Sequence, residues 1–205
     1  MEINKGDVTF TESRRVIFMG AGLGLVLVVL AIAAFSSGKA TGVTGLGVVF
    51  LIGAAWLFAS AWSNRNAGDK PLMVLKEDGI WFFNADRMLP YTSIEGIEIE
   101  TYCTHKDIQF NSTFHITPEK IETVPTFQYG RSDSFLNKPG ATKGRAFRKH
   151  IVVFRYGRLR DADGKLVDMD DLAEELNYRI NRAYEAEAAI LVPTSAANDP
   201  LSPVQ

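Results

Sequence analysis

The chain of 205 residues contains a single cysteine, Cys103, and three histidines. One cysteine cannot form an internal disulfide bond, which is consistent with a reducing compartment. A cysteine nucleophile needs an orienting partner and an oxyanion site, and neither is recognisable around Cys103 and His105. We therefore expect Cys103 to be a structural thiol, buried or half-exposed, and we expect no catalytic residue and no enzyme activity.

Ligands for metals and phosphates are also scarce. Cys103 and the histidines lack the close paired spacing of a zinc site. The segment with Asp161, Asp163 and Gly164 lacks the other ligands of a calcium loop, so it predicts a hairpin turn. Gly20, Gly22 and Gly24 are closely spaced, as in a glycine-rich phosphate-binding loop, but they fall inside an apolar run. No phosphate-cradling loop occurs elsewhere in the sequence. We expect no metal, no cofactor and no small-molecule substrate.

Charged residues and prolines are absent from two long stretches, residues 16–35 and 42–62. At 1.5 Å per residue, each stretch reaches about 30 Å as a helix, the thickness of a bilayer's hydrocarbon core. Both are apolar on all sides, unlike the amphipathic helices of soluble proteins. They predict a transmembrane hairpin that acts as an anchor, because a transporter or channel needs polar groups at membrane depth.

A cleaved export signal is the alternative, because Arg14 and Arg15 form a twin-arginine pair. However, the apolar region of such a signal has about 7 to 15 residues and is not followed at once by a second span. The flanking basic residues predict both termini in the cytoplasm and a multi-pass protein of the cell inner membrane. They are Lys5, Arg14 and Arg15 before the hairpin, and Arg65, Lys70 and Lys76 after it; the connection has only Lys39.

Glycines recur at helical spacing within the two runs, at Gly20, Gly24, Gly45 and Gly53. Small residues at this spacing allow close contact between helix backbones in lipid. We expect them to pack the two helices of the hairpin together, and contact with another membrane protein is the alternative. Trp62, near the cytoplasmic end, is suited to the headgroup level.

After residue 70 the pattern changes to β-strands. The segment "PLMVLKEDGIWFF" predicts strands at 72–75 and 80–83, joined at Asp78 and Gly79, because Asp-Gly accepts the positive φ angles of a tight turn. In "IEGIEIE" the isoleucines alternate with glutamates, so we expect buried isoleucines and solvated carboxylates. Another strand is predicted in "HIVVFRYGRL", paired with "KLV" through the turn "DADG".

The chain then predicts an amphipathic helix at about residues 170–187. Leu172, Leu176 and Ile180 recur at helical spacing, and either Asp168 or Asp170 can cap the first turn. Strands followed by one such helix predict an α+β fold, a small barrel or bent sheet covered by the helix.

The two spans, "LMVLKEDGIWF", "LPYTSIEGIEI" and the final "LAEELNYRI" resemble the bacterial membrane-anchored pleckstrin-homology-like (PH-like) proteins, including an uncharacterised two-span family. The resemblance covers roughly residues 10–185 and implies a PH-like antiparallel barrel with a C-terminal helix, used as an interaction module. The predicted parts are a cytoplasmic head (1–15), a transmembrane hairpin (16–62), a linker (63–70), a PH-like domain (71–190) and a disordered tail (191–205).

Residues 131–150 are strongly basic, with six basic residues against one aspartate in a chain of net charge −2. Glycines and a proline predict a mobile loop there, which could contact anionic headgroups or a protein partner; a merely solvated loop is the alternative. The candidate contacts are Lys138, Lys143, Arg145, Arg148 and Lys149. PH-like proteins that bind phosphoinositides generally do so through a basic first hairpin loop. The corresponding loop here reads "KEDG", so we do not expect phosphoinositide binding. We do not expect nucleic-acid binding either, because no aromatic platform accompanies the basic residues.

These observations predict a non-catalytic membrane protein that displays a PH-like domain on the cytoplasmic face. Its partners would be the lipid bilayer and a cytoplasmic or membrane protein. The alternative is an accessory subunit or immunity-type inhibitor of a membrane complex, which would contact its partner through the hairpin.

Overall fold

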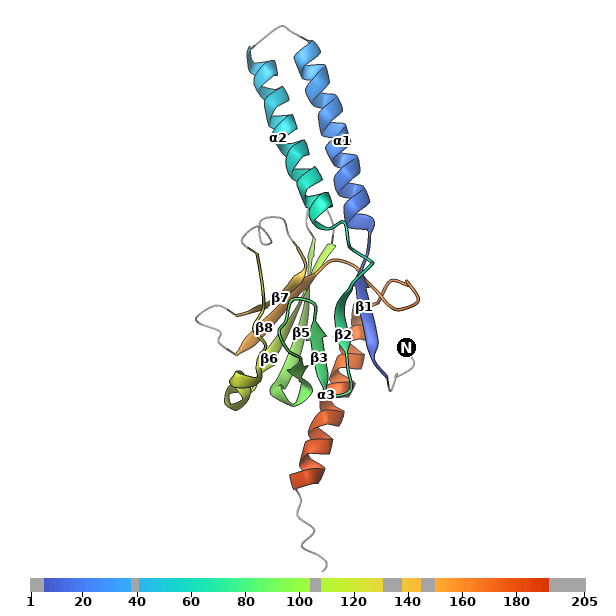
Figure 1. Cartoon of the computed structure of the whole chain (residues 1–205), viewed down its shortest axis with the longest axis vertical. Coiled ribbons are helices and arrows are strands. Elements are labelled where there is room, and N and C mark those ends of the chain that lie inside the picture. The colour runs from blue at the N-terminus through green and yellow to red at the C-terminus, as the bar shows by residue number, and fades with distance from the viewer. Residues whose placement is uncertain (1–5, 38–40, 104–107, 131–137, 145–149, 192–205) are drawn as a thin grey trace, which may run out of the picture.

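The computed structural model describes residues 6–37, 41–103, 108–130, 138–144 and 150–191. Two helices and a mixed helix-and-sheet body follow one another along the long axis of the molecule (Figure 1). The elements are β1 (Val8–Glu12), α1 (Arg15–Ser36), α2 (Thr41–Ser63), β2 (Pro71–Leu75), β3 (Gly79–Phe82), β4 (Leu89–Pro90), η1 (Tyr91–Ser93), β5 (Ile94–Cys103), β6 (Ile108–Ile116), η2 (Pro118–Thr123), β7 (Gly140–Lys143), β8 (Ile151–Tyr156), β9 (Leu159–Arg160) and α3 (Met169–Leu191).

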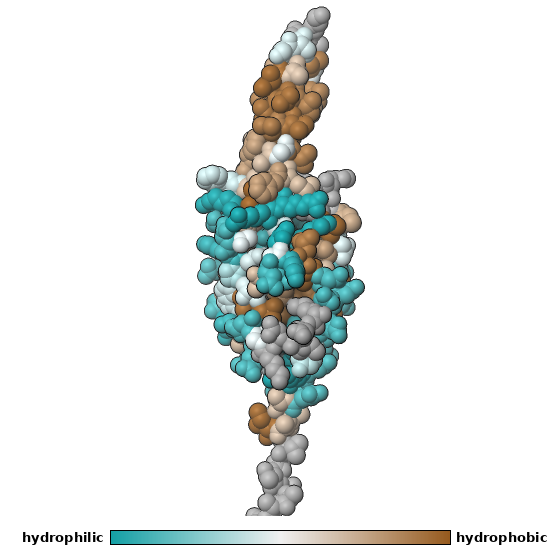
Figure 2. All heavy atoms as spheres, turned by 90° about the vertical axis from the view of Figure 1, so that its right-hand side faces the viewer, coloured by the Kyte–Doolittle hydropathy of each residue, from teal (hydrophilic) through white to brown (hydrophobic). Residues whose placement is uncertain are grey.

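Helices α1 and α2 form an antiparallel hairpin that projects from one end of the body (Figure 1). Their segments Ile17–Ser36 and Gly42–Ser63 are long and apolar enough to cross a membrane. Most of these residues are exposed on the isolated chain, which a core helix of a soluble protein would not be. The surface changes from hydrophobic to hydrophilic where the hairpin meets the body (Figure 2).

The body consists of two antiparallel sheets. One has five strands in the order β4-β3-β2-β1-β9, and the other has four in the order β5-β6-β8-β7. Aromatic rings join the sheets, with the ring centroids of Phe82 and Phe154 5.0 Å apart and those of Phe82 and Phe114 5.9 Å apart. Inside, Ser112 Oγ and Tyr156 Oη lie 2.7 Å apart, and burial raises the pKa of Tyr156 to about 12, so this hydroxyl is protonated at neutral pH.

Strand β1 is the main departure from the sequence prediction, which assigned residues 1–15 to a separate head. It pairs with β2 on one side, where Val8 faces Leu75, and with β9 on the other, where Glu12 faces Leu159. Phe10 is fully buried in the core. The sequence signal is the alternation of apolar and threonine residues in "VTFTE", and burial of one face of that strand explains the pairing.

The predicted hairpin of β2 and β3 is present, with Met73 opposite Phe82 and Leu75 opposite Ile80. The prediction that Gly79 adopts a positive φ angle in the turn is wrong, because this glycine is not among those with positive φ. A Cβ atom at Gly79 would lie 2.3 Å from the carbonyl oxygen of Leu89. Glycine is therefore required at this position by the close passage of β4, not by the turn.

Helix α3 packs its predicted apolar face into the core. Leu172, Leu176 and Ile180 are buried, and Asp168 caps the helix by accepting the Asp170 N–H at 2.9 Å. In β5 the glutamates are exposed as predicted, whereas Ile97 and Ile99 are only half-buried.

The protein is thus α+β, with two apolar N-terminal helices followed by antiparallel sheets. The two sheets are separate and do not close into a barrel, which is one of the two expected arrangements, a barrel or a bent sheet. The folded body also differs from the predicted domain 71–190, because it includes β1. The predicted tail beyond residue 191 lies outside the described residues.

Candidate functional site

The junction between the helical hairpin and the body is fixed by two chain connections. Because β1 and β2 are hydrogen-bonded neighbours, the hairpin is inserted between two adjacent strands of one sheet. Two residues separate the end of β1 from the start of α1, and residues 64–70 connect α2 to β2. Arg14 joins these connections by donating to the Ala67 carbonyl at 3.2 Å and by an ion pair with Asp69.

The end of α2 carries an exposed indole with a cation against its ring. Trp62 is 70% exposed, and the Arg65 guanidinium lies over its ring, 4.8 Å from the centroid. Arg65 also donates to the Trp62 carbonyl at 3.2 Å. An indole with an adjacent cation is suited to the headgroup region, where one side is apolar and the other is wet.

Two cavities open at this junction, with volumes of about 790 and 240 Å³. The described residues that line them include six basic side chains and two acidic ones, in a chain of net charge −2. The basic residues are Arg14, Arg15, Lys70, Lys138, Arg158 and Arg160, and the acidic residues are Glu12 and Asp161. Positive charge is therefore concentrated beside the start of the apolar hairpin.

The predicted basic loop is divided in the structure. Lys138 is half-buried beside the α2–β2 connection, and its carbonyl accepts the Tyr129 hydroxyl at 2.6 Å. Lys143 is exposed on β7, opposite Val152. The prediction of one continuous loop over residues 131–150 is therefore wrong at residues 140–143. These residues pair with β8, because Ala141 is buried in the core. Arg145, Arg148 and Lys149 lie outside the described residues.

Of the four glycines predicted to pack the two helices together, only three lie at the contact between α1 and α2. Cβ atoms added at three of them would meet the opposite helix. A Cβ at Gly20 would lie 3.6 Å from Ala61 Cβ, and one at Gly24 would lie 3.1 Å from the Phe58 ring. A Cβ at Gly53 would lie 3.1 Å from Leu27. A Cβ at Gly45 would meet no described atom within 4 Å. Gly47 is a further close position, because a Cβ atom there would lie 3.0 Å from the Phe35 ring.

The thiol and imidazole groups are dispersed. Cys103 is exposed at the end of β5, so the expectation of a buried or half-exposed thiol is wrong. His115 Nε2 lies 3.4 Å from Glu98 Oε1, and His150 is exposed. In the described part of the chain, no three histidine, cysteine, aspartate or glutamate residues are grouped to hold a metal ion. His105 lies outside that part.

The sequence pattern alone does not identify Arg15, Arg158 and Arg160 as binding residues. The sequence does place Arg158 and Arg160 beside a predicted turn, in the segment "YGRLRDADG". Their position beside Arg15 depends on the pairing of β9 with β1. Comparisons with protein-family models, with curated proteins and with solved structures find no match to this chain.

Proposed function

We propose that this chain is a non-catalytic integral membrane protein that holds a small two-sheet domain against the cytoplasmic face of the inner membrane. The supporting observation is the insertion of the apolar hairpin between adjacent strands β1 and β2. Two short connections restrict the orientation of the domain more strongly than one flexible linker would. The domain therefore presents the same basic face to the bilayer continuously.

The charge distribution supports this orientation. Basic residues at the junction favour the cytoplasmic side and attract anionic headgroups, each contributing about 1 kcal/mol near the surface. We propose that this domain is PH-like, which the antiparallel strands followed by a C-terminal helix support. Binding of a protein partner to the opposite, cytoplasm-facing end of the domain is compatible with this arrangement.

The alternative of an accessory subunit or inhibitor that contacts its partner through the hairpin is less well supported. Gly20, Gly24 and Gly53 lie against the other helix of the same hairpin. Those positions are therefore occupied by internal packing rather than left open for a second membrane protein.

Reporter fusions test the proposed topology. A reporter fused after Gln205 should be active in the cytoplasm, one inserted at Gly38 should be active outside, and the chain should remain in membranes after alkaline carbonate extraction. A C-terminal fusion that is active in the periplasm, or release of the chain by carbonate, would refute the proposed function.

A further inference from the structure

We propose that the larger cavity at the junction binds the phosphate group of an anionic phospholipid from the adjacent leaflet. This inference rests on the proposed function, because it requires the hairpin to lie in a bilayer. It adds a defined site and a ligand class, whereas the proposed function requires only general attraction to the membrane. The cavity lies between the β1–α1 connection, the β8–β9 turn and the turn that follows β9.

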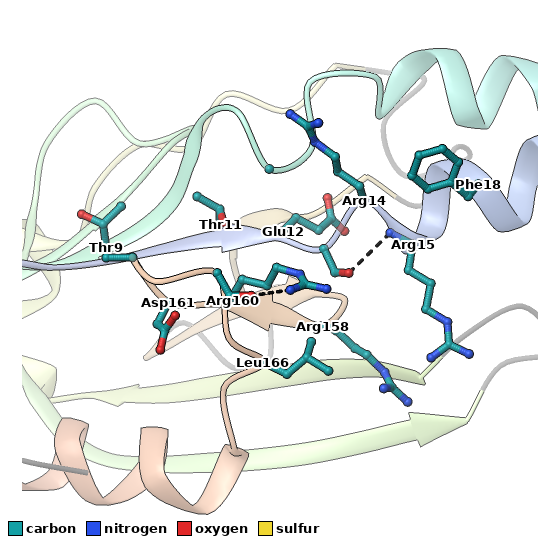
Figure 3. Close-up of a pocket in the computed structure, with 14 residues that line it drawn as sticks. Thr9, Thr11, Glu12, Arg14, Arg15, Phe18, Arg158, Arg160, Asp161 and Leu166 are labelled. Carbon is teal, nitrogen blue, oxygen red and sulfur yellow. Dashed lines mark hydrogen bonds between the residues drawn. The ribbon is translucent and has the colours of Figure 1, made fainter.

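Four arginines line the cavity; Arg14 is paired with Asp69, and the other three come from separate elements. Arg15 begins α1, Arg158 lies between β8 and β9, and Arg160 is on β9. The Ser13 N–H donates to the Arg158 carbonyl at 2.8 Å, so the two segments are held together by their backbones. In Figure 3 the side chains of Arg15 and Arg158 extend in the same direction from these two segments.

The two guanidinium groups are available for a ligand. Arg15 and Arg158 make no side-chain ion pair or hydrogen bond with any residue that the structure describes, whereas Arg160 donates to the Gly164 carbonyl. Of the two carboxylates in the lining, Glu12 is buried, and Asp161 accepts the Lys165 N–H at 2.8 Å. Guanidinium groups bind phosphate oxygens through paired, charge-assisted hydrogen bonds.

Two exposed apolar side chains favour a lipid over a free phosphate. Phe18 is 73% exposed in the first turn of α1, and Leu166 is 51% exposed beside the arginines (Figure 3). Phe18 directly follows the first residue of the apolar segment Ile17–Ser36, which places the cavity at the depth of the headgroups. A phosphate with attached acyl chains would contact both the cations and these apolar groups.

The test uses the full chain purified in a neutral detergent and titrated with dihexanoyl phosphatidylglycerol, with bound lipid counted by native mass spectrometry. Arg158→Gln should weaken binding about tenfold, as expected for loss of a charge-assisted hydrogen bond. Arg155→Gln is the matched control on the same segment, exposed and outside the cavity, and should bind like the parent. Leu166→Glu, at an exposed position, should also weaken binding about tenfold, by repulsion of the phosphate.

Glycerol 1-phosphate and dihexanoyl phosphatidylcholine distinguish the source of the phosphate. We expect both to bind more weakly than the anionic lipid, because one lacks acyl chains and the other carries a neutralising choline. Equal binding of glycerol phosphate would overturn the lipid assignment. The proposed site would be overturned if the parent, Arg158→Gln and Leu166→Glu bound phosphatidylglycerol with equal affinity. Carbonate extraction and reporter fusions test the proposed function separately from this result.

Discussion

At the scale of single residues, Arg179 connects three distant parts of the chain. Its Nε donates to Glu175 at 2.7 Å, and its other nitrogens donate to the carbonyls of Lys76 and Gly6, each at 2.9 Å. The side chains of Arg179 and Glu175 are 7% and 3% exposed. The pair therefore fixes the chain before β1 and the β2–β3 turn to helix α3.

Replacing Arg179 by Met should lower the free energy of unfolding by about 3–5 kcal/mol, because it leaves the Glu175 carboxylate buried without its cation. Removing both charges, as Glu175→Met with Arg179→Met, should cost less than the single change. The measurement is urea unfolding of the detergent-solubilised chain, followed by tryptophan fluorescence. Arg182→Met, at a half-exposed arginine on the same helix, is the control. An equal loss of unfolding free energy in Arg179→Met and Arg182→Met would contradict the prediction.

At the scale of elements, the hairpin depends on close contact between α1 and α2. A leucine at Gly20 would meet Ala61 and the backbone carbonyl of Leu57, so Gly20→Leu should destabilise the hairpin by about 1–3 kcal/mol. Gly22→Leu is the matched control, because a Cβ at Gly22 would meet no described atom within 4 Å. Titration with sodium dodecyl sulfate, read by tryptophan fluorescence, compares the two, and equal midpoints would show that Gly20 is not at the helix contact.

Helix α3 provides the corresponding test for the body. Leu176 is fully buried, so Leu176→Ala should lower the free energy of unfolding by about 2–5 kcal/mol. Ile190→Ala, at an 83% exposed position on the same helix, should have little effect. Urea unfolding of the whole chain in detergent, followed by circular dichroism, measures both, and an unchanged midpoint for Leu176→Ala would mean that α3 is not packed against the sheets.

At the scale of the whole molecule, the body is one folded unit made from both sides of the hairpin. Replacing residues 15–63 by a short Gly-Ser linker should give a soluble, folded domain, because Arg14 and Ala67 are already in hydrogen-bond contact. A fragment that starts at residue 64 should not fold stably, because it lacks β1 and exposes the edges of β2 and β9.

Near-ultraviolet circular dichroism and amide chemical-shift dispersion compare these two variants. A well-folded fragment 64–205 would show that β1 is dispensable. An unfolded linker variant would show instead that the domain requires the hairpin for its stability.

The local features of the fold follow from short segments of the sequence. Two uncharged runs, the hairpin of β2 and β3, and the apolar face of α3 follow from periodicity and length, because each depends on residues close together in the chain. Pairing between segments far apart depends on which apolar faces can be buried together. Three features depend on such long-range burial: β1 joins the sheet, the passage of β4 requires glycine at position 79, and the sheets remain separate. The candidate site also depends on the tertiary structure, because Arg15 and Arg158 line one cavity only when β9 pairs with β1, on the side of β1 away from β2.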